Sequence, residues 1–348
     1  MNNTKVQQLE KKGNRENEGE FDHFLGLDWS EKTMAIARMT GRMKEPIVFE
    51  RPTDLKELKM YLGRLGGKTI LTIEETTTSQ WLYLELRDYV DRLIICDPFR
   101  NRLLSDGPQT DKIDARKLCL LLRANMLKEV YHSSDRLYEL RRLVSAYEDV
   151  VGQGVRILNQ HSALERARIP KNVLQKDLKL YTAYLDKSEE IYSDTKKEFE
   201  KKFAALSKQI PKMKKQMALP GIGVIGAAKI MAYAVDGKRF RKTGKYYSYC
   251  GLVKLELLSG GRSYGRKRPR ANTHLKTVYK TAAMIAIQGK NPMREYYDYL
   301  LSKGIAHYNA RQAVARYIAR VSYGMLKNGQ SFEPYRWRKS KEEKATAA

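Results

Sequence analysis

The spacing of apolar residues changes once along the chain, near residue 132, and this change limits the possible folds more than any other feature. Residues 21–132 alternate segments of helical period with short apolar runs, which are HFLGLDWS, TMAIARM, PIVFE, KTILTIEET and RLIICDP. Three consecutive runs predict a three-stranded meander, and the helices between later runs predict crossovers to parallel strands. The expected order βββαβαβα gives a mixed sheet covered by helices, an α/β domain.

Strand patterns disappear between about residues 133 and 215. Apolar residues recur there at helical spacing, from Leu137 to Leu158 and, after a break at Pro170, from Leu185 to Ile210. This spacing predicts two long helices. Three arrangements stay open: an antiparallel hairpin, a coiled coil between subunits, and an ordinary helical bundle packed on its neighbours.

The region from residue 216 to 335 is predicted to be an α-rich domain. It opens with LPGIGVIGAAKIMAYA, in which Gly221 and Gly223 resemble the turn of a helix-hairpin-helix element. Backbone N–H groups in such a turn can bind a phosphate, although the same residues also suit a plain turn. Three helical segments follow. Residues 1–20 are predicted to be a disordered leader and residues 336–348 a similar tail, so the catalytic, helical and C-terminal domains are expected at 21–132, 133–215 and 216–335.

The chain is strongly basic. It carries 66 Lys and Arg against 40 Asp and Glu, a net charge of +26, and its isoelectric point is near 9.8. Residues 237–280 hold thirteen of these cations against one acid, Glu256, with tyrosines that could stack on bases. Nucleic acid is therefore the expected partner, and the candidate binding residues are Gly221, Gly223, Lys245, Gly260, Gly261, Arg262, Arg266, Lys267, Arg268 and Arg270.

Cysteine, histidine and hydropathy patterns exclude several other classes. Cys96, Cys119 and Cys250 lie far apart in apolar surroundings, which indicates reduced core residues, and the five histidines lack metal spacing, so zinc is not expected. No apolar run approaches the ~20 residues of a membrane span, and the N-terminus lacks the apolar segment of a signal peptide. We expect no membrane association and a cytoplasmic location.

Two acids stand three residues apart in QTDKIDARKL, Asp111 and Asp114, where they would be neighbours on one helical face. Two interpretations are open. Thr110 can cap the helix and acids suit its first turn, which accounts well for Asp111 and less well for Asp114. Alternatively, the pair holds a metal ion together with acids from elsewhere in the chain.

Two further acids end buried strands. Asp28 follows the apolar LGL of the first strand, and Glu74 ends TILTIE of the fourth. In an RNase H-like fold these strand ends and the last helix converge at one sheet edge, so the four acids would meet. Without a basic partner they would repel, and two divalent ions about 4 Å apart would resolve the repulsion. Oxygen-only ligation favours Mg²⁺ or Mn²⁺.

The motifs LGLDWSEKTMAIA, ILTIEETTTSQWLYLEL, IICDPFRNRLL and KIDARKLCLLLR resemble the RuvC-like DEDD domain of the bacterial insertion-sequence transposases numbered one hundred and ten, relatives of the Piv DNA invertase. The segment from LPGIGVIGAAKIMAYA to LLSGG resembles the second domain of that family, and together the segments cover most of residues 21–330. The resemblance makes Asp28, Glu74, Asp111 and Asp114 the family's acids. It places the family's essential serine, a nucleophile toward DNA, on Ser259.

The resemblance implies a Mg²⁺-dependent DNA recombinase that forms a covalent serine–DNA intermediate. It further implies that serine and acids come from different subunits, that the helical middle region makes dimer contacts, and that two dimers assemble on donor and target DNA. A noncoding guide RNA would choose the sequence by base pairing, while the protein holds the backbones. Nucleoid association in a bacterial cytoplasm follows from these expectations.

Alternatives remain on the residues alone. Gly260 and Gly261 would let a phosphate approach Ser259, and neighbouring cations would neutralise its charge, but the same stretch could be a basic loop in which the serine only donates a hydrogen bond. Ser263 is a competing hydroxyl. The chain could instead be a RuvC-like nuclease or resolvase that uses a metal-activated water, or a non-catalytic nucleic-acid-binding scaffold.

Overall fold

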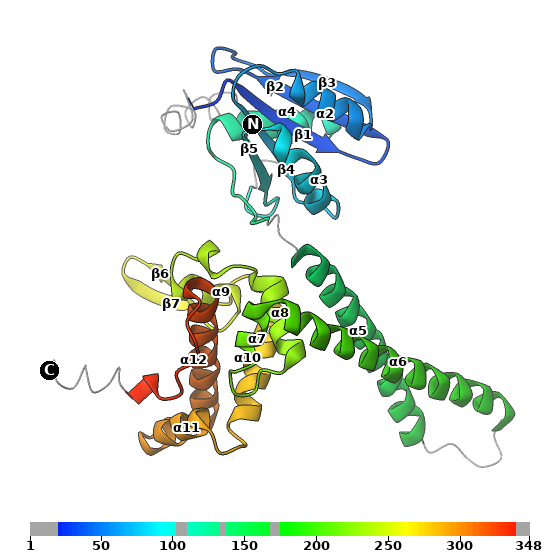
Figure 1. The fold of residues 1–348 in the computed structure, drawn as a ribbon, viewed down its shortest axis with the longest axis vertical. Helices are drawn as coiled ribbons and strands as arrows, with labels where there is room; N and C mark the ends of the chain where they lie inside the picture. The colour runs from blue at the N-terminus through cyan, green and yellow to red at the C-terminus, as the bar shows by residue number, and fades with distance from the viewer. Residues whose placement is uncertain (1–19, 102–109, 133–136, 168–174, 339–348) are drawn as a thin grey trace. The chain divides into compact units, whose positions relative to one another are not determined.

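The computed structural model describes residues 20–101, 110–132, 137–167 and 175–338, with the side chains of residues 175–177 left out (Figure 1). Most of the predicted leader, Pro170 and the end of the predicted tail lie outside these ranges. The chain divides into two compact units, one ending at Ser134 and one starting at Asp135. The finer predicted division into 133–215 and 216–335 stays a prediction.

The first unit contains the predicted mixed sheet, which is confirmed together with its order of strands and helices. A short 3-10 turn, η1, is the only element in the described part of this unit that was not predicted. The elements are β1 (His23–Trp29), β2 (Thr33–Met39), β3 (Ile47–Pro52), α2 (Leu55–Gly63), β4 (Thr69–Glu74), α3 (Ser79–Leu86), η1 (Arg87–Tyr89), β5 (Arg92–Cys96) and α4 (Asp111–Arg123).

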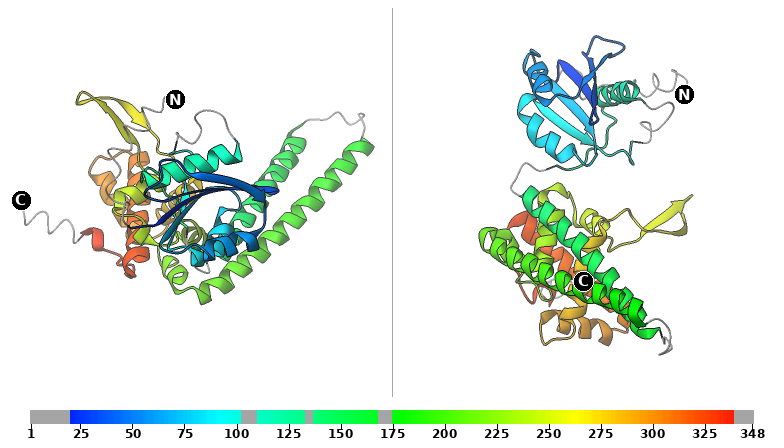
Figure 2. Two further views of the ribbon diagram at one scale, coloured as in Figure 1. Left: turned by 90° about the horizontal axis from the view of Figure 1, so that it is seen from above. Right: turned by 90° about the vertical axis from the view of Figure 1, so that its right-hand side faces the viewer.

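The sheet has the strand order β3-β2-β1-β4-β5. β1 is antiparallel to β2 and parallel to β4, and β4 is parallel to β5. Successive side chains of a strand point to opposite faces. Leu25 and Leu27 accordingly pack with α2 and α3 on one face, while Phe24 packs with α4 on the other. Figure 2 shows the resulting three layers, with the sheet between α4 and the α2–α3 pair.

Helix α4 lies in close contact with β1 at Gly26. A Cβ added at Gly26 would lie 2.4 Å from the Ala115 carbonyl oxygen and 2.6 Å from the Cys119 nitrogen, both in the helix backbone. Real Cβ atoms do not approach backbone this closely, so only glycine allows the contact. The Cys119 thiol also donates to the Phe24 carbonyl oxygen at 3.2 Å. The position of α4 on the sheet is therefore set by backbone contact as well as by its apolar face.

The second unit begins with two long helices, α5 (Leu137–Arg166) and α6 (Gln175–Gln209). Tyr147 packs against Phe203 with ring centroids 5.5 Å apart, while further along α5 the buried Gly154 lies against the Tyr192 ring. Contacts that advance along α5 thus move backwards along α6, and the two helices form an antiparallel hairpin within one chain. A coiled coil between subunits stays a prediction.

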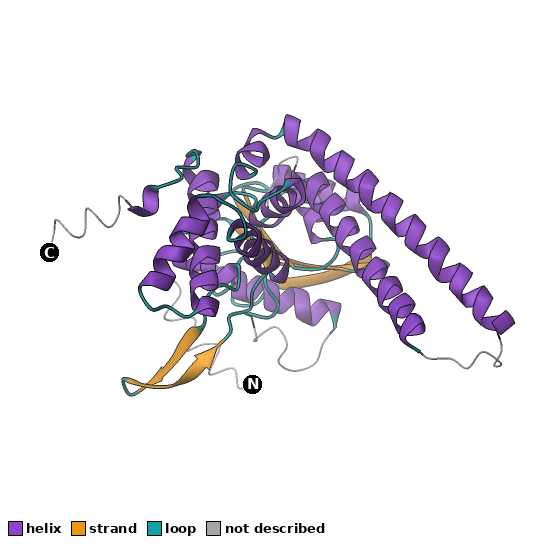
Figure 3. Cartoon of the chain, turned by 90° about the horizontal axis from the view of Figure 1, so that it is seen from below, coloured by secondary structure: helices purple, strands orange, loops and turns teal. Residues whose placement is uncertain are grey.

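The remaining helices of the second unit pack around one large core, into which the base of the α5–α6 hairpin also fits. They include the three predicted helices near the C-terminus. A two-stranded sheet that was not predicted is largely exposed and contributes no residue to this core (Figure 3). The elements are α7 (Pro211–Gln216), α8 (Val224–Ala234), η3 (Gly237–Arg239), α9 (Thr243–Tyr249), β6 (Leu255–Ser259), β7 (Arg262–Lys267), α10 (Thr273–Ala286), α11 (Pro292–Ser302) and α12 (His307–Asn328).

A chain of polar groups crosses the core of this unit. The hydroxyls of Tyr246 and Tyr279 are hydrogen-bonded, Tyr279 contacts the Ser322 hydroxyl at 2.8 Å, and Ser322 donates to the Gln216 side-chain oxygen at 2.7 Å. All four residues are buried. Because each polar group finds a partner, the chain ties α7, α9, α10 and α12 together without leaving an unsatisfied hydroxyl. Across the described ranges, no helix combines the length and apolarity needed to span a membrane.

The contact at Gly26 generates the first prediction. Gly26→Ala would force α4 away from β1, and overpacking of this kind costs roughly 1–3 kcal/mol in the free energy of unfolding. Urea unfolding followed by tryptophan fluorescence is a suitable measurement, because Trp29 and Trp81 lie in this unit with ring centroids 5.9 Å apart. Gly41→Ala is the matched control, since a Cβ there meets nothing within 4 Å. Equal stability of the two variants would contradict the steric role of Gly26.

Candidate functional site

Strand alternation places Asp28 and Glu74 on the face of the sheet that α4 covers. Gly26 and Asp28 are two residues apart in β1, so they share the α4 face. β1 and β4 run in parallel with Leu27 opposite Ile73, so Asp28 and Glu74 occupy the next positions of the two neighbouring strands. The first turn of α4, which carries Asp111 and Asp114, is on the same face.

The electrostatics of Asp28 reflect this arrangement. Its pKa is raised to about 6, first by burial and then by the negative charges of Asp111, Asp114 and Glu74. The pKa of Glu74 is also raised, by burial and by Asp114. Each carboxylate in such a group makes ionisation of the others less favourable. The structure thus brings the four acids into one electrostatically coupled cluster.

The start of α4 is held by two threonines. Thr110 caps the helix, with its hydroxyl accepting a hydrogen bond from the Ile113 N–H at 3.3 Å. The Thr33 hydroxyl donates to Asp111 Oδ2 at 2.9 Å and so links the beginning of β2 to the acid cluster. Ser30 supports Thr33 by donating to its carbonyl oxygen at 2.7 Å. Capping and the acid cluster therefore involve the same turn, and neither interpretation of this helix start excludes the other.

A cation also reaches the cluster, so the acids are not without a basic partner. Lys117 Nζ lies 3.5 Å from Asp114 Oδ1, one turn along α4, and the lysine side chain is 16% exposed. Sequence reasoning missed this pair although its i,i+3 spacing was visible, because the neighbouring Lys112 and Arg116 gave the same signal. Lys112 pairs instead with Glu50 at 2.9 Å. One positive charge offsets part of the repulsion among four carboxylates.

The donor set suits a hard divalent cation. Carboxylate oxygens are the ligands that Mg²⁺ and Mn²⁺ prefer, and a cation would relieve the repulsion that, after burial, raises the pKa of Asp28. Within the described residues, no group of three or more Asp, Glu, His or Cys side chains already has the arrangement of a metal site. The buried thiols are unsuitable ligands: burial raises the pKa of Cys96 and of Cys119 to about 12.

A pH dependence of stability follows for the metal-free protein. Asp28 has an ordinary pKa of 3.8 when unfolded and about 6 when folded, so the folded state binds the proton more tightly. This contribution to stability is fully present below pH 3.8 and is lost as the pH rises through about 6. Urea unfolding in EDTA should show wild type losing stability between pH 4 and 7 relative to Asp28→Asn. The exposed Asp88→Asn should behave as wild type, and equal pH profiles for all three proteins would contradict the cluster.

Ser259 lies in the other unit, at the end of β6. It is exposed and pairs with Arg262, the first residue of β7, across the two-residue turn Gly260-Gly261. The two glycines have φ values of +55° and +77°. A type I′ hairpin turn requires positive φ at both central positions, which favours glycine. Turn geometry alone therefore accounts for the glycine pair that sequence reasoning assigned to phosphate approach.

The β6–β7 hairpin separates the two candidate hydroxyls. Ser263 pairs with Leu258, the neighbour of Ser259, so the two serines point to opposite faces of the hairpin. Both are exposed. The register shifts next to Leu258, leaving Tyr264 unpaired and 67% exposed. The exposed cations Arg262, Arg266 and Lys267 lie on β7, which makes this hairpin a basic surface close to Ser259.

Replacement of Gly260 can distinguish the two roles of the glycine pair. Gly260→Asn retains the turn, because Asn-Gly is a favoured type I′ sequence, but adds a side chain next to Ser259. On the prediction that Ser259 forms a covalent adduct with DNA, glycines that serve only the turn would let this variant keep the wild-type adduct yield, while Gly260→Val would lower it at least about tenfold. The readout is the covalent adduct on denaturing gels, and a loss as large for Asn as for Val would contradict the turn-only role.

The other candidate nucleic-acid residues have different surroundings. Gly221 has a φ of +80°, and a Cβ there would lie 2.2 Å from the Ala282 carbonyl oxygen, so it is needed for the turn to pack on α10. Gly223 is exposed and precedes α8, which lacks a side-chain cap. Lys245, Arg268 and the remaining candidate, Arg270, are exposed. The helix-hairpin-helix likeness stays a prediction.

A mixed sheet with four acids at one edge is typical of metal-dependent enzymes that act on phosphodiesters. Two family models match this chain, and both are models of transposases. A DEDD transposase model named for IS110 matches residues 25–167, which include all four acids. The model described as "Transposase IS116/IS110/IS902 family" matches residues 213–298, which include Ser259. The observed fold of the first unit is consistent with an RNase H-like DEDD transposase.

Curated relatives give the same family. The chain is 31% identical over 117 residues to the "Insertion element IS110 uncharacterized 43.6 kDa protein" of Streptomyces coelicolor, and 29% identical over 118 residues to the IS116 protein of Streptomyces clavuligerus. These matches cover 33% and 34% of this chain, and 29% and 30% of the relatives' lengths. The chain belongs to the IS110 family of DEDD transposases.

Proposed function

We propose that this chain is the transposase of a mobile insertion element and that it cleaves and rejoins DNA strands through a covalent serine–DNA intermediate. The observation that carries the proposal is the four-carboxylate cluster at the start of α4, where burial and then the neighbouring charges raise the pKa of Asp28 to about 6. Such a cluster favours divalent cations, and phosphoryl transfer uses them to offset charge on the scissile phosphate. The family matches supply the substrate class, which is DNA.

Asp28, Glu74, Asp111 and Asp114 would hold the cations, and two Mg²⁺ or Mn²⁺ ions would polarise the scissile phosphate when bound. Thr33 keeps Asp111 in place through its 2.9 Å hydrogen bond, and Thr110 caps the helix that carries both aspartates. Lys117 limits the net negative charge near Asp114. These contacts from neighbouring residues orient the carboxylates, and a metal site requires its ligands to be held in such fixed orientations.

Ser259 is the proposed nucleophile. Its Oγ forms a bond to phosphorus, the bond between phosphorus and one deoxyribose oxygen breaks, and the hydroxyl proton leaves to a base while the released oxygen is protonated. Religation to a second strand reverses these steps, so the bond energy is retained without ATP. Arg262, paired directly with Ser259, is positioned to offset phosphate charge. The family resemblance supports donation of the serine by one subunit to the acids of another, within a dimer of dimers.

Guide RNA is part of the proposal. A net charge of +26 suits contact with long phosphate backbones, and delegated base pairing would choose donor and target DNA. The location that fits this activity is the bacterial nucleoid. The alternative function is a metal-dependent nuclease or resolvase, because a metal-activated water needs only the acids.

Covalent trapping tests the proposal. Element-end DNA is incubated with protein and Mg²⁺, then resolved on denaturing gels. Wild type and Ser263→Ala should give a protein–DNA adduct, while Ser259→Ala should lower adduct yield by about a hundredfold or more, because it removes the nucleophile. Asp28→Asn should abolish both adduct and cleavage, and EDTA should do the same to wild type.

The outcomes separate the candidate functions. Cleavage by Ser259→Ala at the wild-type rate, with no adduct for any protein, would identify the nuclease alternative. Unchanged Mg²⁺-dependent cleavage in Asp28→Asn would exclude the acid cluster as the active site. Gel shifts of the same DNA in EDTA show whether each variant still binds.

A further inference from the structure

A cavity of about 640 Å³ opens in the second unit beside the base of the β6–β7 hairpin. Its walls come from four parts of the chain: the segment after α9, the end of β7 with the residues that follow, helix α10 and helix α12. The volume lies within the ~300–1,000 Å³ of pockets that bind small-molecule-sized groups. Nothing in the proposed cleavage chemistry uses this cavity.

The lining is basic and contains no acid. Its cations are Lys254, Arg266, Arg268, Lys276, Lys280 and Arg316. None of the six forms an ion pair with a carboxylate in the part of the chain that the structure describes. Lys276 and Lys280 lie one turn apart on α10, and they are half-buried like Arg316 of α12. Like charges gathered in a concave space repel, and a bound polyanion would relieve that repulsion.

The lining also contains groups that suit a nucleobase. Tyr308, in the first turn of α12, is 61% exposed and offers its ring next to the cations. Asn309 and Gln312 follow on the same helix, and their amides can donate to and accept from base edges. α12 begins without a side-chain cap, so its first N–H groups add positive potential on this side.

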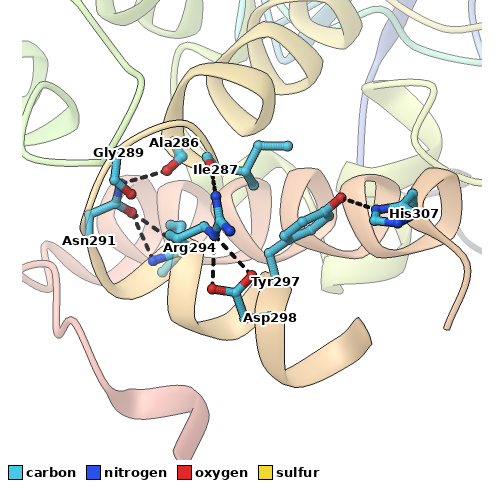
Figure 4. A network of polar contacts seen from close by, with 9 residues as sticks. Ala286, Ile287, Gly289, Asn291, Arg294, Tyr297, Asp298 and His307 are labelled. Carbon is cyan, nitrogen blue, oxygen red and sulfur yellow. Dashed lines mark hydrogen bonds and ion pairs between the residues drawn. The ribbon is translucent and has the colours of Figure 1, made fainter. Parts of the chain in front are cut away.

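The beginning of α12 is fixed by a polar network on α11 (Figure 4). The Tyr297 hydroxyl contacts His307 Nδ1 at 2.8 Å, directly before Tyr308. Asn291 caps α11, accepting from the Met293 N–H at 2.9 Å, and Arg294 donates to the Ile287 carbonyl oxygen at 3.0 Å. These contacts join the end of α10 to α11 and α11 to α12. The helix start that carries the aromatic and amide groups is thereby held in place before a ligand arrives, which lowers the entropy cost of binding.

We propose that this cavity binds an unpaired nucleotide segment of a nucleic-acid strand, with the cations on its phosphates and Tyr308 stacked on a base. Aromatic stacking needs an exposed base face, which a continuous duplex does not offer. A concave site with six cations, one exposed ring and two amides therefore favours a single strand over a duplex. The inference rests on the proposed nucleic-acid partner but not on strand cleavage or on Ser259 chemistry.

Binding assays in EDTA test the inference without cleavage. Full-length protein is titrated into labelled twelve-nucleotide oligo-dT, oligo-U, an abasic strand and a duplex, at several salt concentrations. Wild type should bind oligo-dT or oligo-U more tightly than the abasic strand, and the tighter of the two identifies DNA or RNA as the source. Tyr308→Ala should weaken this binding about tenfold and remove the advantage over the abasic strand. Tyr308→Phe should retain wild-type binding.

The cations have a separate signature. The double variant Lys276→Ala/Lys280→Ala should lower the slope of log K against log salt by about 0.7 for each lost phosphate contact on a single strand. Lys187→Ala/Lys202→Ala removes the same charge from exposed positions on α6 and should leave the slope unchanged. Circular dichroism melting confirms that each variant is folded.

Three results would overturn the inference. The first is an equal decrease in salt slope for the cavity double variant and the α6 double variant. The second is a loss of duplex affinity in Tyr308→Ala as large as its loss of single-strand affinity. The third is a wild-type protein that does not bind single strands. Because adduct formation is measured separately, an intact adduct assay together with any of these results would leave the recombinase proposal in place and remove only the cavity.

Discussion

The close contact between α4 and β1 at Gly26 is the constraint on which the candidate active site depends. Because the backbones of α4 and β1 are in contact there, the helix has one fixed position on the sheet. This position brings the first turn of α4 over the ends of β1 and β4. Charge repulsion among the four acids destabilises this position of α4. Three contributions stabilise it: the apolar packing of Ala115, Cys119 and Leu122, the Thr110 cap, and the ion pair of Lys117 with Asp114. The fold thus stabilises an arrangement that the acids alone would not adopt.

The two units divide the chemistry by charge. The first gathers carboxylates under a helix and suits cations, whereas the second gathers lysines and arginines around a hairpin and a cavity and suits phosphates. A phosphodiester strand carries the charge that both surfaces can use, since its oxygens bind metal ions and its backbone offsets the basic groups. The strongly basic composition and the acid cluster are therefore complementary properties of this chain.

Much of the first unit could be predicted from sequence because its signals are local. The short apolar runs indicated the strands, and Thr110 indicated the start of α4. The contacts that refine the site are not local: Thr33 reaches Asp111 across 78 positions, and nothing near either residue indicates it. In the second unit, the exposed strands β6 and β7 lack buried alternation, although Gly-Gly between short runs is a hairpin signal. The cavity could not be predicted because its cations come from α10, α12, β7 and the segments beside β6 and β7, which meet only in the fold.

The β6–β7 hairpin connects the cavity to Ser259. A two-stranded ribbon with exposed side chains is marginally stable by itself. Arg266 belongs to this ribbon and also lines the cavity, so an occupant of the cavity stabilises the strand that is paired with the one ending in Ser259. Conversely, an ordered hairpin places Arg266 in the lining of the cavity and so favours binding there. On the role proposed for Ser259, binding in the cavity and ordering of the hairpin that carries its hydroxyl are thermodynamically linked, so the hairpin is less ordered when the cavity is empty.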